Sequence, residues 1–205
     1  MAKGSSGQFM KEILDNPWFY GLSQSLITLG GPAIVSRRIR GLISQLPPEK
    51  HILDVGCGPK SYLFRMGLSP VGLDLSPVYV CKYMRAGKSG VMASADALPF
   101  ASESFGGIWA TALFHHLPDP VAYKTMREFL RVCGRPGYVA IVDWVSPRSK
   151  WRRPLVAPIQ SLDRGKFTRS QEDLEAMLPD KANWTIRRFT YSAFGLEMIS
   201  CLYLK

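Results

Sequence analysis

Short apolar runs alternate along the chain with segments in which apolar residues recur every three or four positions. The apolar runs are predicted strands, near residues 51–55, 70–74, 91–95, 106–111, 137–143, 184–191 and 198–204. The intervening periodicity is typical of amphipathic helices. This alternation predicts an α/β fold built on a doubly wound, mostly parallel sheet, with the last two strands forming a hairpin.

Proline, glycine and capping residues mark where the predicted helices begin and end. Asn16 and Pro17 begin a helix over 18–29, and Pro32 begins a second. The buried stripe of the second helix is predicted to be Val35, Ile39, Leu42 and Leu46. Two later helices are predicted near 120–132 and over 169–178, the latter started by a capping box of Thr168 and Gln171.

The length of 205 residues is enough for one domain with a sizeable core. Residues 10–205 are expected to form it, and residues 1–9 to be a disordered leader or an expression remnant. Its expected parts are an N-terminal helical cap (10–48), a ligand-binding core (49–143), a substrate-side insertion (144–167), and a C-terminal helix and hairpin (168–205).

The segment His51–Pro59 combines a buried strand with a glycine turn. Gly56 and Gly58 lack Cβ atoms, so the turn can adopt positive φ and a ligand can approach the backbone closely. Asp54 places a carboxylate beside this turn. In a doubly wound sheet, such a turn is where a nucleotide-like ligand binds.

Two further acidic residues follow the next two predicted strands. Asp74 lies 16 residues beyond Gly58, near the spacing at which a strand-end carboxylate accepts hydrogen bonds from a ribose diol. Asp96 follows the third strand. Because parallel strands end at one edge of a sheet, the three acids are predicted to lie together. For each acid taken singly, a helix cap or a solvated loop is the alternative.

The formal net charge is +10, and the basic residues cluster at 37–40, 82–88 and 148–153. A surface of one sign attracts nucleic acid, phospholipid headgroups or acidic small molecules. The alternative is a basic protein with solvated faces. The cluster at 148–153 also contains a tryptophan, which predicts peripheral contact with anionic lipid.

No uninterrupted apolar run approaches the roughly 18 residues of a membrane-spanning helix, and the pattern of a signal peptide is missing. The four cysteines, Cys57, Cys81, Cys133 and Cys201, show no metal-ligand spacing, and three of them lie in apolar runs. Buried thiols in a reducing compartment are the simplest explanation. We therefore expect a cytoplasmic protein with no metal site.

Several motifs resemble those of class I S-adenosylmethionine-dependent methyltransferases, specifically the branch that includes the C-methyltransferases of ubiquinone and menaquinone biosynthesis. The main matching segments are LDVGCG at 53–58, GLD at 72–74, ADALPF at 95–100, SF at 104–105, FHHLPD at 114–119, LRV at 130–132 and RPG at 135–137. The resemblance covers about half the chain. It implies S-adenosyl-L-methionine as cofactor and a Rossmann-like sheet of seven strands, the last antiparallel.

The resemblance also implies which residues contact the cofactor: Asp54, Gly56, Cys57, Gly58, Asp74, Leu75, Asp96, Ala97, Ala110 and Thr111. Asp74 would hold the ribose hydroxyls, and Asp96 would bond the adenine amine. The chain departs from the family pattern at Lys60, where a third glycine usually stands, and at Gly106, where an acid is usual. A shortened connection after the turn predicts only a stubby helix near 61–66.

Aromatic residues and histidines are candidates for the acceptor side of the site. The predicted acceptor contacts are Trp18, Tyr20, His115 and Trp144. Of the histidine pair after the fourth strand, His116 is the candidate base, because a histidine with a near-neutral pKa can take a proton from the acceptor. Asp143, at the end of the fifth strand, is a second candidate catalytic group. The alternative is that the histidine pair only packs and caps.

The predicted function is methyl transfer from S-adenosylmethionine to O, N or C of a small, lipophilic or anionic acceptor. An RNA methyltransferase is an alternative that the charge favours and the lack of an appended RNA-binding module disfavours, so nucleic acid is the less favoured partner. A non-catalytic protein that binds the cofactor or a partner is the other alternative, because of the altered glycine turn. No obligate protein partner is indicated.

Overall fold

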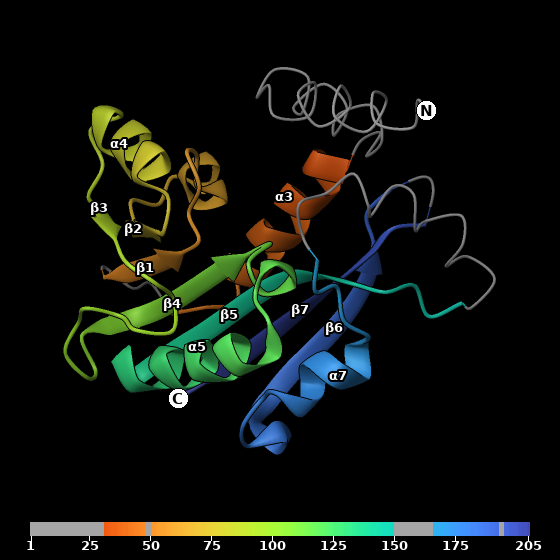
Figure 1. Ribbon diagram of the computed structural model, residues 1–205. Helices are drawn as coiled ribbons and strands as arrows, with labels where there is room; N and C mark the ends of the chain where they lie inside the picture. Colours follow the sequence, from red (N-terminus) through yellow and green to blue (C-terminus); the bar gives the residue numbers. More distant parts are fainter. Residues whose placement is uncertain (1–30, 48–50, 150–165, 193–194) are drawn as a thin grey trace, which may run out of the picture.

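The computed structural model describes residues 31–47, 51–149, 166–192 and 195–205 (Figure 1). They form a seven-stranded sheet of order β3-β2-β1-β4-β5-β7-β6, parallel except for β7, which pairs antiparallel with both neighbours. The strands are β1 (Ile52–Val55), β2 (Val71–Asp74), β3 (Gly90–Met92), β4 (Phe105–Thr111), β5 (Cys133–Val145), β6 (Trp184–Thr190) and β7 (Glu197–Leu204). The predicted doubly wound sheet is confirmed.

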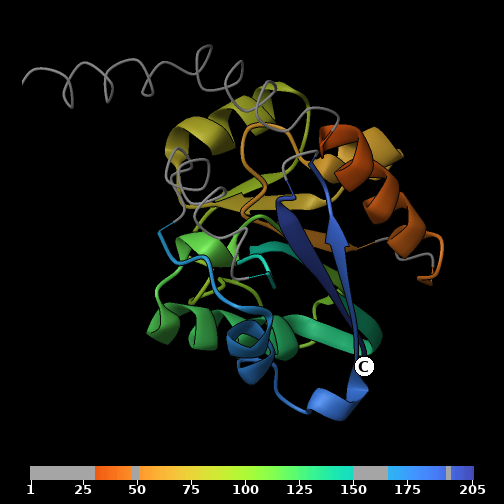
Figure 2. The same ribbon diagram turned by 90° about the vertical axis from the view of Figure 1, so that its right-hand side faces the viewer.

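Helices cover both faces of this sheet (Figures 1 and 2). One face carries α3 (Gly31–Ile43), α4 (Pro77–Arg85) and the 3-10 helix η1 (Tyr62–Met66), and the other carries α5 (Asp119–Val132) and α7 (Gln171–Ala176). Two short 3-10 helices complete the set, η2 (Phe114–His116) and η3 (Lys181–Asn183). Two apolar cores result, one on each side of the sheet.

The central strands supply both cores at once. Every residue of β1 is buried. Ile52 packs into the core under α3, whereas Leu53 and Val55 belong to the core under α5. A strand that is buried on both faces needs a continuous apolar run rather than an alternating pattern, which is why these strands were visible in the sequence.

The predicted helices that fall within the described residues are confirmed, with differences in length or in helix type. The stripe of α3 is buried at Val35, Ile39 and Leu42, but the helix ends at Ile43, before Leu46. The stubby helix after the glycine turn is the 3-10 helix η1, which begins at the Ser61 cap and ends at Gly67 with φ of 82°.

The helix α4 was not predicted, although its start has a clear signal in the sequence. The Ser76 side chain accepts a hydrogen bond from the Tyr79 N–H, and Pro77 stands in the first turn. The strand β5 is also longer than the predicted 137–143.

The predicted start of the C-terminal helix is wrong. The capping residue is Ser170, whose Oγ accepts from the Asp173 N–H at 3.1 Å, and not Thr168. Arg169 therefore precedes the helix, where its side chain is free to turn inward; it is only 8% exposed.

Some predictions lie outside the described residues: Trp18, Tyr20 and the first helix of the predicted cap, and residues 150–153 of the basic cluster. Across the ranges that the structure describes, no helix combines the length and apolarity needed to cross a bilayer. Cys57, Cys133 and Cys201 are buried free thiols, as predicted, and Cys81 is exposed.

Candidate active site

The glycine turn follows β1 at the point where the strand order reverses, between β1 and β4. Gly56 and Gly58 have φ of 72° and 58°, a left-handed backbone that favours glycine. The N–H groups of Gly56 and Cys57 both donate to the Leu73 carbonyl, at 2.7 and 3.1 Å. At Gly56 an added Cβ would meet the Leu113 side chain at 2.9 Å, so the turn packs closely against the loop after β4.

Asp74 links this turn to the start of α4. The Gly58 N–H donates to Asp74 Oδ2 at 3.0 Å, and the Ser76 N–H donates to Oδ1 at 2.8 Å. A carboxylate offers about four lone-pair positions, so these two bonds use about half of its capacity. The carboxylate is half-buried and lines a pocket.

That pocket, of about 490 Å³, lies at the carboxyl ends of β1, β2 and β4. The predicted residues that line it are Gly56, Gly58, Asp74, Leu75 and His116. The sequence analysis missed its other lining residues, which are Leu73, Tyr79, Ala93, Ser94, Ala95, Ala112, Leu113 and Leu117. Most of the missed residues are apolar and gave no chemical signal, although the cap at Ser76 and Pro77 marked the helix that carries Tyr79.

Six predicted cofactor residues lie outside the lining of the pocket, and Asp54 is one of them. Asp96 accepts a hydrogen bond from the Ser94 hydroxyl, and Ala97 is exposed. At the end of β4, Ala110 is fully buried, and Thr111 Oγ1 accepts from the Trp109 indole at 2.8 Å. The Cys57 thiol donates to the Gly58 carbonyl, and burial holds its pKa far above the usual range.

Asp54 is buried beneath the turn, with 4% of its surface exposed. Burial raises the pKa of its carboxyl from an ordinary 3.8 to about 7, a hydrogen bond from the Ser61 side chain lowers it in part, and the charge of Asp74 raises it further. Asp54 is thus a buried acid whose charge the fold disfavours, and it is coupled to Asp74.

Asp143, by contrast, is fully occupied by protein donors. Its Oδ2 accepts from the N–H groups of Leu113 and Phe114, at 3.0 and 2.5 Å. Its Oδ1 is bonded to His115 Nδ1 at 2.6 Å and to the Trp144 N–H at 2.7 Å. Only 1% of this residue is exposed, so the carboxylate acts as a fixed anchor for the loop after β4.

The two histidines of this loop occupy different environments. His115 is buried, and its Nδ1 carries the proton that the Asp143 carboxylate accepts. Its ring stacks on Trp144, with centroids 4.6 Å apart and planes 11° apart, and Trp144 in turn stacks near Tyr191 at 6.1 Å. His116 is exposed and lines the pocket.

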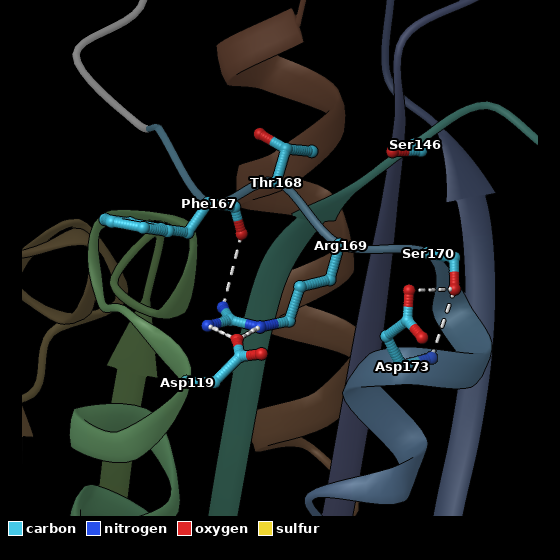
Figure 3. A pocket seen from close by; sticks show the side chains of 7 residues that line it. All are labelled: Asp119, Ser146, Phe167, Thr168, Arg169, Ser170 and Asp173. Atoms are coloured by element: carbon cyan, nitrogen blue, oxygen red, sulfur yellow. Dashed lines mark hydrogen bonds and ion pairs between the residues drawn. The ribbon is translucent and has the colours of Figure 1, made fainter.

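Arg169, which was not predicted as a site residue, fixes the same loop from the other side. Figure 3 shows its guanidinium beside Asp119 and the Phe167 carbonyl. Its guanidinium donates to the carbonyls of Phe114 and Leu117, at 2.7 and 2.6 Å, and to Asp119 Oδ1, at 2.6 and 3.0 Å. In addition, the Phe167 N–H donates to the His115 carbonyl at 2.9 Å. Residues 167–169 thereby hold the backbone on both sides of His116.

The strand order, the glycine turn at its reversal and the adjacent acid define a doubly wound fold with a nucleotide-type binding site. A family model described as a methyltransferase domain matches residues 53–141. Among solved structures, a SAM-dependent methyltransferase from Thermotoga maritima superposes with a TM-score of 0.70 at 15% identity, covering 96% of this chain and 99% of that one. That likeness concerns the fold.

Two curated relatives are similar in sequence. A 2-methyl-6-phytyl-1,4-hydroquinone methyltransferase from Synechocystis sp. is 29% identical over 135 residues, which cover 57% of this chain and 41% of that protein. A tRNA U34 carboxymethyltransferase from Nautilia profundicola is 28% identical over 105 residues, which cover 46% of this chain and 34% of that protein. The matched region spans less than half of either relative.

Together with the fold, these matches show that residues 53–141 belong to a methyltransferase domain of the class I S-adenosylmethionine-dependent type, which resembles the quinone-biosynthesis branch. The pocket fits the cofactor of this class, because Asp74 keeps two acceptor positions for a diol and Gly58 is open above the turn. An added Cβ at Gly58 would meet nothing within 4 Å.

Proposed function

We propose that the chain methylates a small lipophilic acceptor of the phenol or hydroquinone type. The observation that carries the proposal is the pocket itself, in which one half-satisfied carboxylate, Asp74, stands among mostly apolar walls. A hydroquinone methyltransferase among the relatives supports the same acceptor class.

On the cofactor side, Asp74 would accept hydrogen bonds from the two ribose hydroxyls. The Gly58 N–H in the glycine turn holds the Asp74 carboxylate in place. Asp54, Gly56, Cys57 and Gly58 would form the floor beneath the methionine part. Leu75 would cover the adenosine, and Asp96 and Ala97 would meet the adenine edge. Ala110 and Thr111 would support the loop that closes the pocket. S-adenosylmethionine supplies an electrophilic methyl group on sulfur and leaves as S-adenosylhomocysteine.

On the acceptor side, His116 would accept the proton that the acceptor hydroxyl or ring carbon loses as its bond to the methyl group forms. Asp143 would act as a positioning residue, since its oxygens are already occupied by four donors. His115 and Trp144 would form an aromatic wall, and Leu113 and Leu117 would exclude water from the transfer.

The test is a methyl-transfer assay with labelled cofactor against hydroquinones, phenols, phospholipids and tRNA. Transfer to hydroquinones or phenols is expected. His116→Asn should lower kcat by roughly a hundredfold with little change in KM, because it removes a base and leaves binding intact. His51→Asn is the matched control, since His51 is exposed just before β1, at the opposite edge of the sheet. Failure to bind the cofactor at millimolar concentration would refute the enzyme proposal.

A second candidate acceptor is tRNA, favoured by the net charge of +10 and by the tRNA-modifying relative. Methyl transfer to tRNA, with none to phenols or hydroquinones, would establish this alternative. Its affinity would fall steeply with salt, since cationic residues release counterions from the phosphates.

A further inference from the structure

A groove between α3 and the terminal hairpin lies on the sheet face opposite α5 and shares no residue with the active-site pocket. Its volume is about 350 Å³. It is lined by Arg37 and Arg38 of α3, by Gln45 in the turn after α3, and from the hairpin by Arg187, Arg188, Phe189 and Ser200. Residues about 150 positions apart in the sequence thus bring their cations to one place.

The charge of this groove is not balanced within the parts of the chain that the structure describes. There, Arg37, Arg38 and Arg187 form no ion pair, and no carboxylate lines the groove. Their neighbour Arg188 differs, because its guanidinium is bonded to Glu197, Gln171 and the Ser146 carbonyl. The sequence shows the arginine pairs at 37–38 and 187–188, but only the structure shows which of these guanidiniums have an ion-pair partner among the described residues.

The groove is also partly preorganised. The Arg38 guanidinium lies over the Phe189 ring, 5.3 Å from its centroid, a cation–π contact that restricts the side chain. The Ser200 hydroxyl donates to the Arg187 carbonyl at 3.2 Å and ties that part of β6 to β7. Phe189 itself is buried and packs into the core under α3.

Three cations that line one groove repel one another, and a multiply charged anion would offset that repulsion. Guanidinium groups suit phosphate in particular, because their planar fork of donors matches two phosphate oxygens. Ile34 and Leu42 add apolar surface beside the cations. We propose that the groove between α3 and β6 binds a phosphate group attached to a carbon skeleton, either in a soluble phosphate ester or in a lipid headgroup.

The proposal is tested by titrating inorganic phosphate and glycerol 3-phosphate into the protein in a calorimeter. Arg38→Gln/Arg187→Gln should weaken binding by at least about tenfold, the scale of a lost charge-assisted hydrogen bond. The affinity of Arg38→Lys/Arg187→Lys should lie between those of the wild type and the glutamine variant, because lysine keeps the charge but lacks the planar pair of donors. Lys124→Gln/Arg127→Gln is the matched control: it removes the same charge from exposed residues of α5, on the other face, and should leave binding unchanged.

Vesicles distinguish the two sources of phosphate. Cosedimentation with phosphatidic acid in phosphatidylcholine, but not with phosphatidylcholine alone, and its loss in Arg38→Gln/Arg187→Gln, would support the lipid headgroup. Binding of glycerol 3-phosphate without cosedimentation would support the soluble ester. No phosphate binding, or equal weakening in the α5 control, would overturn the proposal, as would binding of RNA without binding of phosphate. Cofactor affinity should stay the same in every variant, whether or not the proposed acceptor is right.

Discussion

Asp74 and Asp143 occupy equivalent places, each at or near the end of a parallel strand and at the same edge of the sheet, yet the structure uses them differently. Asp74 is half-buried, receives two backbone donors and faces the pocket. Asp143 is buried and receives four donors, two on each oxygen. The number of protein donors therefore separates a carboxylate that can bind a ligand from one that holds a loop in place.

If Asp143 anchors the loop and Asp74 does not, removing the Asp143 carboxylate should destabilise the fold more than removing that of Asp74. Asp143→Ala should lower the free energy of unfolding by roughly 3–5 kcal/mol, because three backbone N–H groups and a buried histidine lose their acceptor. Urea unfolding measures this loss. Asp74→Ala should cost far less in the same experiment, and equal losses would contradict the distinction.

Asp54, beneath the glycine turn, is a third carboxylate, and burial disfavours its charged form. Its pKa is raised to about 7, so the folded protein binds the proton more tightly than the unfolded chain, and wild-type stability should fall as the pH rises from about 4 to 7. Asp54→Asn should gain up to about 4 kcal/mol over the wild type at pH 8 and nothing below about pH 4. Stability curves that stay parallel across this range would show that Asp54 titrates normally.

Arg169 is the second support of the loop after β4, so its removal should also destabilise the protein. Arg169→Met should lower the free energy of unfolding by roughly 2–3 kcal/mol, because the Phe114 and Leu117 carbonyls and Asp119 lose charge-assisted bonds. Hydrogen exchange should show faster opening of residues 113–119 and unchanged protection of β1. Arg127→Met, an exposed arginine of α5, is the control that should change neither measurement.

The smallest expected effect concerns binding alone. Asp74→Ala should weaken the affinity for S-adenosylmethionine by about 1–3 kcal/mol, the scale of lost hydrogen bonds to a charged group. Calorimetry measures it. If affinity is unchanged, the two spare acceptor positions of Asp74 do not contact the cofactor.

Local signals in the sequence were enough for the strands and for the glycine turn. Continuous apolar runs marked β1 and β4 because both faces of these strands are buried, and the spacing of Gly58 and Asp74 suggested a strand-end carboxylate at a ligand site. The C-terminal helix shows where such signals fail. Thr168 and Ser170 are both good caps two residues apart, and the choice depends on where the Arg169 side chain is buried, which is a tertiary contact.

The parts of the site that the sequence did not reveal are those made by distant residues. Asp143 bonds Leu113 and Phe114 across about 30 positions, and Arg169 bonds Phe114 across 55. An acid at the end of a strand looks the same in a sequence whether two or four donors will surround it. The role of Asp143 as an anchor therefore depends on strand order, which places the end of β5 beside the loop after β4.

The positions of Asp143 and Arg169 in the sequence have a consequence for how such domains can diverge. Both residues follow β4 in the chain, whereas the glycine turn and Asp74 precede it. In the proposed site, the acceptor side and its two supports therefore lie in one continuous stretch of sequence. We expect a chimera joined after β4 to keep these supports, provided that the residue at position 113 still fits against Gly56.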